Sequence, residues 1–454
     1  MVAYRPALLF SDSWAYISTA FAHHLVSLPY LRPIGYSILI RVLTIPGRDL
    51  TQLVALQHLA GLAIGAGVYA ALVRAGVRRV WAVAASTLVI LDGYAITLEQ
   101  YVMPDTFFAL TLLLALLVLG LPRLISDPRA GASTSPRRAA LSGLLVAAAA
   151  LQREVALFAL PVMLIYLIWA LAGWRASLAL LIAAAIPLCS YAAVMDAKTG
   201  VFGITATSGW TLYSRVAGFA RCSEAGIAPD ARPLCETAEQ RSKHVRGPGW
   251  YMWDAASPAN RLFRSNHETR AQKSRANGIL GGFAQQIILH QPGAFAAAAG
   301  TDFLRYFTPG ATSRADAVSA TSLPQAATEE TVDAGIRRRL IPKVHPVVES
   351  PATFMRRYRQ ILHVPRFVLS LLGVLTLAGL GFRVASRREV LLFGGTALTL
   401  LLGTAATAGF GLRYLLPVVP LLAIGGGLAG RDLGARVREL RGGRWHSPDT
   451  QAST

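Results

Sequence analysis

The sequence predicts an all-α polytopic membrane protein with one sizeable domain outside the membrane. Hydrophobic residues make up 54% of the 454 residues, and only 15% are charged. Apolar stretches close to the ~20 residues that a helix needs to cross a bilayer recur along the chain. One long polar stretch interrupts them. A soluble chain of this length contains more polar residues, so the membrane is the environment that this composition predicts.

Nine segments have the length and composition of candidate membrane-spanning helices. Six precede the polar stretch and three follow it. In order they are residues 53–73, 80–98, 106–121, 139–151, 155–171, 176–194, 367–382, 390–409 and 414–429.

These segments divide the chain into four parts. Residues 1–195 form an N-terminal transmembrane region with juxtamembrane helices, and residues 196–365 form an extracytoplasmic loop domain of mixed structure. Residues 366–430 form the C-terminal transmembrane helices, and residues 431–454 form a basic tail. The loop domain is long enough to fold as a small module of its own.

The formal net charge of +20 agrees with nucleic-acid binding or with the rule that cytoplasmic loops of membrane proteins are basic. The placement of the charges favours the second explanation and excludes nucleic acid as a partner. Arginines cluster in short loops that alternate with poorly basic ones. With nine crossings, all of these clusters and the basic tail fall on one side, which the rule assigns to the cytoplasm. The clusters are Arg74, Arg78 and Arg79; Arg123, Arg129, Arg137 and Arg138; and Arg383, Arg387 and Arg388.

The same parity places residues 1–50 outside the cell, yet nothing before Asp12 is long enough to cross a bilayer. Either a transmembrane helix precedes Met1 in the complete protein, which we favour, or another feature carries this end across the membrane. Residues 31–46 are apolar but short, and they contain Arg32 and Arg41. This segment is typical of a helix that lies in the membrane interface.

The polar stretch contains two of the three cysteines, Cys222 and Cys235, whereas Cys189 lies in an apolar segment. Outside the cytoplasm these two either form a disulfide or remain free thiols, and the oxidising compartment favours the disulfide. Residues 247–258 are rich in aromatic residues and are either a recognition loop or a packed turn. Residues 294–307 are predicted to form an amphipathic helix that returns to the membrane.

Acidic residues are rare in the membrane segments, so those at the outer ends of spans are candidate functional groups. Asp12, Glu99 and Asp105 all face the extracytoplasmic side by parity. Together they are predicted to bind a divalent cation, Mg²⁺ or Mn²⁺, or to accept a proton. The structural alternatives are helix capping by Asp12 and Asp105 and a solvated position for Glu99. Asp92 is predicted to be structural.

Three arginines, Arg32, Arg153 and Arg413, are predicted at the same outer helix ends. A guanidinium keeps its charge in a low-dielectric setting and binds phosphate oxygens with two parallel hydrogen bonds, so these residues are candidate phosphate ligands. The alternative is that each side chain extends to lipid headgroups. The sequence has no phosphate-binding P-loop, no zinc-protease motif and no nucleophile elbow, which excludes the common nucleotide-driven transporters and hydrolases.

At these residues the sequence resembles the GT-C superfamily of polyprenyl-phosphate-dependent glycosyltransferases, especially the bacterial relatives of protein O-mannosyltransferases and of the lipid A aminoarabinose transferase. The segments that carry the resemblance extend over the whole membrane region. They are DSWAY (12–16), RPIGYSILIRVL (32–43), LEQYVMPDTFF (98–108), QREVALFALP (152–161) and GLRYLLPVVPLL (411–422).

The resemblance implies that Asp12 is the catalytic aspartate of the first outer loop, and that Glu99 or Asp105 is the acid of the second. It also implies that RPIGY opens a juxtamembrane helix. The family normally has a helix before the first-loop aspartate, and this chain departs from that pattern.

The expected function is the transfer of a sugar from a polyprenyl-phosphate donor to an envelope lipid, glycan or protein. The reaction is expected on the outer face of the bacterial plasma membrane, by direct displacement with inversion, with Asp12 taking the proton of the acceptor. The alternatives are a transporter or flippase of lipid-linked sugars, and a non-catalytic scaffold of the cell envelope.

Overall fold

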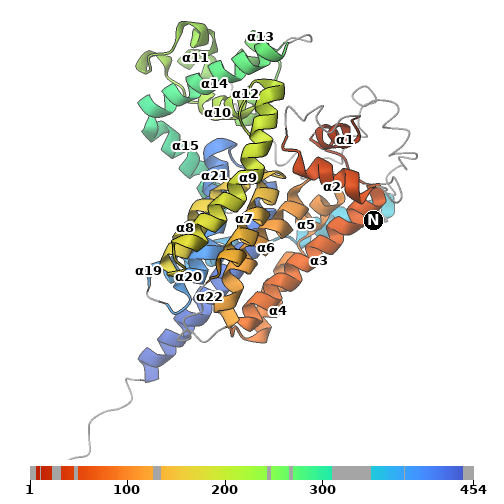
Figure 1. Ribbon diagram of the computed structural model, residues 1–454, viewed down its shortest axis with the longest axis vertical. Coiled ribbons are helices and arrows are strands. Elements are labelled where there is room, and N and C mark those ends of the chain that lie inside the picture. The colour runs from red at the N-terminus through yellow and green to blue at the C-terminus, as the bar shows by residue number, and fades with distance from the viewer. Residues whose placement is uncertain are drawn as a thin grey trace, which may run out of the picture.

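The structure, a computed structural model, is all-α in the residues that it describes (Figure 1). Its one β-type contact there is an isolated bridge between Leu8 and Tyr101. The predicted fold class is therefore confirmed. The described residues are 7–10, 12–22, 32–44, 50–125, 134–242, 247–264, 269–308, 349–382 and 384–442. Of the arginines in the predicted basic clusters and tail, Arg129, Arg383 and Arg444 lie outside them.

The first half of the chain contains the short juxtamembrane helices and the first group of apolar helices. They are α1 (Ser13–Phe21), α2 (Gly35–Leu43), α3 (Leu50–Arg74), α4 (Arg79–Ile90), α5 (Gly93–Gln100), α6 (Asp105–Ile125), α7 (Pro136–Ala150), η1 (Glu154–Phe158), α8 (Ala159–Trp169) and α9 (Trp174–Thr199).

The helices of the predicted extracytoplasmic loop domain and the last apolar helices follow. They are α10 (Ser208–Ala217), η2 (Cys222–Glu224), η3 (Pro229–Leu234), α11 (Ala238–Ser242), α12 (Pro248–Trp253), α13 (Pro258–Phe263), α14 (Arg270–His290), α15 (Pro292–Arg305), α18 (Glu349–Ile361), α19 (Arg366–Gly381), α20 (Arg387–Val390), η5 (Leu391–Gly395), α21 (Thr396–Thr407), η6 (Leu412–Tyr414) and α22 (Leu415–Gly442). The part of that domain from α10 to α15 is called the outer module below.

Helices are present at all nine predicted spans, but fewer of them meet the requirements for crossing a bilayer. Four are long and apolar enough, namely Leu50–Arg74, Trp174–Thr199, Arg387–Thr407 and Leu412–Leu440. Two further pairs qualify if each is one span bent by 44°. Helix α7 has 15 residues, fewer than the ~20 that a straight span needs. By length and composition, then, four to six of the described helices or bent helix pairs qualify as crossings.

The bend between α4 and α5 shows how a polar residue interrupts an apolar stretch. Asp92 precedes α5 with an extended backbone, and its carboxylate accepts a hydrogen bond of 3.2 Å from the backbone N–H of Tyr94. An aspartate that caps a helix start satisfies donors that would otherwise be unpaired inside an apolar region. Asp92 is thus a structural residue, as the sequence predicted.

The loops predicted to be cytoplasmic lie together at one end of the helical domain. Arg431, far along α22, donates a hydrogen bond to the carbonyl of Ala75 after α3. Asp432 accepts hydrogen bonds from the backbone N–H and the hydroxyl of Ser386, at 2.8 and 2.6 Å. The guanidinium of Arg387 lies 4.8 Å from the ring centre of Trp169. These contacts agree with the parity of the predicted threading.

The outer module has its own hydrophobic core, at the end of the molecule opposite to the C-terminal part of α22 (Figure 1). Tyr213, Tyr251 and Phe283 from three different helices pack together in it. Cys222 and Cys235 are joined by a disulfide at the edge of this core. A second core on this scale shows that the polar stretch contains a folded module. Helix α15 leads from it back to the apolar helices, where it packs against α21.

Candidate active site

The segment before Asp12 is fixed to the segment before Asp105 by backbone hydrogen bonds. The N–H of Leu8 donates to the carbonyl of Gln100 at 2.9 Å, and the N–H of Val102 donates to the carbonyl of Leu8 at 3.0 Å. The paired residues shortly precede Asp12 in one segment and Asp105 in the other. The pairing therefore brings the two aspartates to the same place. The parity of the spans predicted a shared side, and this bridge supplies the proximity.

A close approach of α2 to the end of α7 brings two of the arginines to this place. The N–H of Gly35 donates to the carbonyl of Leu151 at 2.6 Å. A Cβ atom at position 35 would lie 2.7 Å from that carbonyl oxygen, so only glycine fits there. Arg32, three residues before Gly35, and Arg153, two residues after Leu151, therefore enter one site.

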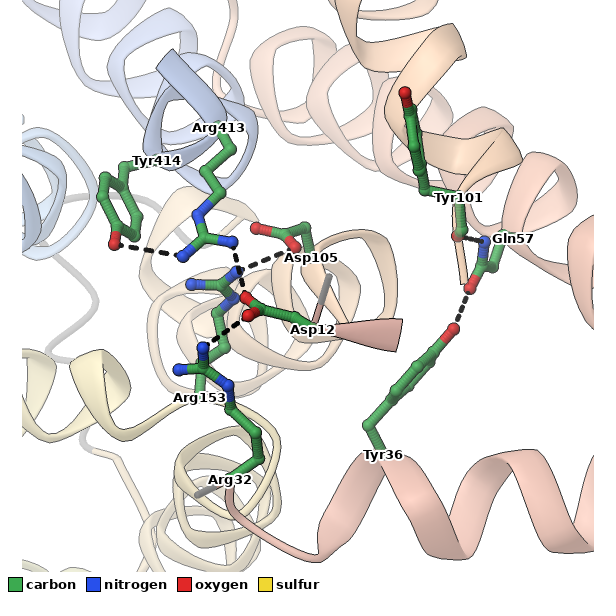
Figure 2. Close-up of polar contacts among 9 residues, drawn as sticks. All are labelled: Asp12, Arg32, Tyr36, Gln57, Tyr101, Asp105, Arg153, Arg413 and Tyr414. Carbon is green, nitrogen blue, oxygen red and sulfur yellow. Dashed lines mark hydrogen bonds and ion pairs between the residues drawn. The ribbon is translucent and has the colours of Figure 1, made fainter. Parts of the chain in front are cut away.

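Asp12 is held between two arginines that lie far apart in the sequence (Figure 2). Its carboxylate accepts hydrogen bonds from Arg32 at 2.5 Å and from Arg413 at 2.9 Å. Asp12 precedes α1, but its side chain makes no capping hydrogen bond to that helix. The helix-capping alternative for Asp12 therefore finds no support, because both carboxylate oxygens are bound by guanidinium groups.

Asp105 forms the third ion pair of the site. Its carboxylate accepts a hydrogen bond of 2.9 Å from Arg153, and only 1% of the residue is exposed. Burying this carboxylate would be costly without a partner of opposite charge. The Nε of Arg153 has no hydrogen-bond partner among the described residues, so the guanidinium keeps one donor unused.

Tyr414 lies beside both Arg413, which pairs with Asp12, and Arg153, which pairs with Asp105. Its hydroxyl lies 3.5 Å from Arg413 Nη2, and its ring centre is 5.3 Å from the guanidinium carbon of Arg413 and 5.5 Å from that of Arg153. Cations are attracted to the face of an aromatic ring at such distances. Tyr414 thereby helps to keep two guanidinium groups side by side (Figure 2).

The site carries one more positive charge than negative charge, since three guanidinium groups face two carboxylates. Burial alone would raise the pKa of Asp12, but the charges of Arg413, Arg32 and Arg153 outweigh this effect and lower it to about 2. Its contribution to stability is therefore present above the ordinary value of 3.8 and is lost as the pH falls through about 2. At neutral pH Asp12 is a carboxylate, and the site as a whole attracts anions.

Glu99 lies outside this group of ion pairs, contrary to the prediction that the three acids gather in one place. Its carboxylate pairs with His58 Nδ1 at 2.7 Å, and Nε2 of the same ring contacts Gln100 at 3.1 Å. Glu99 also lines a cavity between α3, α5 and α22, with Asp92 and mostly apolar side chains. It is only 9% exposed, so it is not a solvated charge at the rim.

The predicted metal site of Asp12, Glu99 and Asp105 does not form. In the part of the chain that the structure describes, no three acidic, histidine or cysteine side chains gather as ligands of one ion. The physical reason is that the two acids belong to different helices: Glu99, near the end of α5, pairs with His58 of α3, whereas Asp105, at the start of α6, pairs with Arg153.

Three neighbours of the candidate residues were not predicted from the sequence: Tyr414, His58 and Trp253. Tyr414 follows Arg413 directly, so its position next to a candidate phosphate ligand was the available signal. His58 gave no signal, because a single histidine in an apolar helix is usually a core residue. Trp253 lies in the aromatic segment 247–258, and its ring centre is 5.9 Å from the guanidinium carbon of Arg32.

The loop before Arg413 is held by a tyrosine of the returning helix. The hydroxyl of Tyr306 accepts a hydrogen bond from the N–H of Gly411 at 3.1 Å and lies 3.4 Å from the carbonyl of the same residue. Its ring packs at 4.7 Å against that of Phe410. These contacts fix the loop two residues before the guanidinium that holds Asp12.

Replacing Tyr306 by phenylalanine is expected to lower the free energy of unfolding by about 1 kcal/mol, because the ring is kept and only its hydroxyl hydrogen bonds are lost. If the site binds a polyprenyl phosphate, as the resemblance implies, the loosened loop should also weaken the binding of undecaprenyl phosphate by roughly fivefold. Thermal unfolding and lipid titration measure the two effects. Tyr69→Phe, on α3 against the main core, is the control. Unchanged lipid binding in Tyr306→Phe would show that the loop does not depend on this hydroxyl.

No family model matches the chain. No curated protein matches it either. Solved structures to which it is similar in fold include the archaeal oligosaccharyltransferase AglB from Archaeoglobus fulgidus, in complex with an inhibitory peptide and a dolichol-phosphate. The identity is 12% and the TM-score is 0.39, over 100% of this chain and 51% of that one. The chain thus spans about half the length of the archaeal protein.

A second similar structure is ArnT from Cupriavidus metallidurans bound to undecaprenyl phosphate. The identity is 14% and the TM-score is 0.33, over 98% of this chain and 77% of that one. A polyprenyl phosphate is bound in both of those structures.

Proposed function

We propose that the chain is a membrane glycosyltransferase that uses a polyprenyl-phosphate-linked sugar as its donor. The observation that carries this proposal is the position of Asp12 between Arg32 and Arg413, next to the pair of Asp105 and Arg153. The acceptor is a hydroxyl group of an envelope lipid, glycan or protein. The reaction takes place on the extracytoplasmic face of a bacterial plasma membrane.

The arginines are suited to the lipid phosphate. A guanidinium binds phosphate oxygens in a fixed fork, and it remains charged where an amine would lose its proton. In the free protein, the carboxylate of Asp12 satisfies Arg32 and Arg413 as an anion of the phosphate would. When the lipid phosphate enters, it takes over hydrogen bonds from these two arginines and balances the excess positive charge of the site.

This exchange also prepares Asp12 as a base. With a pKa of about 2, the carboxylate of the free protein is a weak proton acceptor. A phosphate next to Arg32 and Arg413 compensates the charges that lower this pKa and adds a negative charge of its own, so the pKa of Asp12 rises on donor binding. Catalysis by a base is most efficient when its pKa approaches the working pH.

The chemical step is a direct displacement at the anomeric carbon. The acceptor oxygen forms a bond to this carbon while the bond from the carbon to the phosphate oxygen breaks. The electron pair of the broken bond stays on the phosphate, and the proton of the acceptor hydroxyl passes to Asp12. One displacement inverts the configuration of the anomeric carbon. Arg32 and Arg413 stabilise the charge that grows on the leaving phosphate.

The residues present do not fit a divalent cation. Each of the two aspartates is already bound by a guanidinium, and the net charge of the group is positive, which disfavours a cation. Hard cations such as Mg²⁺ prefer several oxygen ligands together, and Glu99 points away from the other two acids. We therefore assign the stabilisation of the phosphate charge to the arginines.

A lipid-binding experiment and a transfer experiment together test this proposal. The purified protein in nanodiscs should bind undecaprenyl phosphate, but not undecaprenol, which has the same tail without the phosphate. With a panel of undecaprenyl-phosphate hexoses and pentoses and an envelope extract, it should release undecaprenyl phosphate and leave the sugar on an acceptor. Equal binding of the two lipids would contradict the phosphate site. Transbilayer movement of an intact donor without release would identify a transporter instead.

A further inference from the structure

Helix α12 of the outer module contacts Arg32 and the start of the loop that leads to Arg413. At its first residue, Pro248 packs against Gly409, where a Cβ atom would lie 3.1 Å from the proline ring. Gly409 begins the loop that leads to Arg413. At its last residue, the ring of Trp253 lies 5.9 Å from the guanidinium carbon of Arg32. One short helix therefore connects the outer module with Arg32 and with the loop before Arg413.

The inner face of α12 is fixed firmly in the core of the module. Tyr251 is 2% exposed, and its hydroxyl donates a hydrogen bond of 2.8 Å to Glu236. The side-chain amide of Asn260 donates hydrogen bonds to the carbonyls of Met252 and Asp254, at 3.2 and 2.8 Å. These are the residues on either side of Trp253, so the backbone that presents its indole is held on both sides.

Trp253 itself remains 45% exposed. Tryptophan is normally well buried, and an exposed one on a rigid support is a feature of ligand-binding surfaces. The C–H groups on one face of a sugar ring pack against an aromatic face, which carries partial negative charge. An exposed indole next to a phosphate site is therefore suited to a sugar phosphate.

We propose that Trp253 is the platform on which the sugar ring of the donor stacks. This inference rests on the proposed function. In a polyprenyl-phosphate sugar, a single oxygen joins the phosphorus to the anomeric carbon. A phosphate bound by Arg32 thus places the sugar ring beside Arg32, where Trp253 lies. Trp253 is a binding residue in this role, because Asp12 and the arginines carry out the chemistry.

If the sugar stacks on Trp253, removing the indole should lower the affinity for the sugar-bearing lipid only, because the bare lipid phosphate has no sugar to stack. Trp253→Ala should weaken the binding of an undecaprenyl-phosphate hexose by about tenfold. It should change the binding of undecaprenyl phosphate by less than about twofold. Trp253→Phe, which keeps an aromatic face, should recover most of the lost affinity. The probes are undecaprenyl phosphate and the tightest-binding member of a panel of its glucose, mannose and arabinose esters.

Trp174 supplies a matched control. It is also an exposed tryptophan with an arginine over its ring, since Arg175 lies 5.8 Å from the ring centre and 70% of Trp174 is exposed. It begins α9, whose other end at Thr199 approaches the outer module. Trp174→Ala removes the same group at the far end of a 26-residue helix, and it should leave both affinities unchanged.

Several outcomes would overturn the inference, and they can be told apart. An equal loss of affinity for both lipids in Trp253→Ala would show that Trp253 only positions Arg32. An unchanged affinity for the donor with a raised KM for the acceptor would assign the indole to the acceptor. Wild-type affinity for both lipids would remove Trp253 from the site while leaving the proposed function intact. Failure of the wild-type protein to bind either lipid would contradict the proposed function as well.

Discussion

Replacing Asp12 by asparagine is expected to reduce the rate of sugar transfer by about 1,000-fold, since the loss of a general base costs 10²–10⁴ in rate. Asparagine has nearly the same shape as aspartate but cannot accept the proton of the acceptor hydroxyl. The rate of undecaprenyl phosphate release under single-turnover conditions measures this effect, because it separates the chemical step from the binding steps.

The same variant should bind undecaprenyl phosphate at least as tightly as the wild-type protein. In the wild-type protein Asp12 competes with the phosphate for Arg32 and Arg413, and asparagine removes this competing charge. Asp432→Asn is the matched control, because Asp432 is also paired with an arginine, at 2.6 Å, but at the other end of the domain. Full transfer activity in Asp12→Asn would exclude Asp12 as the base.

The helices of this protein could be predicted from the sequence because each depends on a local property. Hydropathy and length placed a helix at every predicted span. The bends could not be predicted in the same way. The 44° bend between α4 and α5 lies at Asp92, whose carboxylate accepts a hydrogen bond from the start of α5, and one polar residue in an apolar segment does not distinguish a bent span from a straight one. The length of each helix was not predicted either, since α7 has 15 residues, fewer than the ~20 of a straight span.

The members of the site could be predicted better than their pairing. Parity placed Asp12, Asp105 and the three arginines on one side, and the structure brings them together. That Asp12 pairs with Arg413, 401 residues later, depends on the tertiary packing of the first and last segments. Glu99 shows the opposite case. It is six residues from Asp105, but it lies on a different helix and pairs with His58, and a single histidine in an apolar helix does not indicate such a pairing in the sequence.

Replacing Arg413 by alanine is expected to weaken the binding of undecaprenyl phosphate by about 100-fold, because removing one partner of a buried charged hydrogen bond costs 2–5 kcal/mol. The affinity of Arg413→Lys for undecaprenyl phosphate should lie between those of the wild-type protein and Arg413→Ala, because lysine keeps the charge but loses the fork that binds two oxygens at once. Isothermal titration in nanodiscs measures the affinities. Arg431→Ala is the control, since Arg431 also pairs with an aspartate but at the opposite end of α22.

A double mutant separates a direct contact with the phosphate from an indirect effect through Asp12. In the Asp12→Asn background, Arg413 has no carboxylate to hold, so any remaining effect of Arg413→Ala on lipid binding comes from the phosphate itself. We expect the loss of about 100-fold to persist in that background. If Arg413→Ala has no effect there, Arg413 serves only to position Asp12, and the phosphate must bind to Arg32 and Arg153 alone. The excess positive charge of the site makes the persistent loss the expected result, because Arg413 with Asp12 neutral is a free cation beside the lipid phosphate.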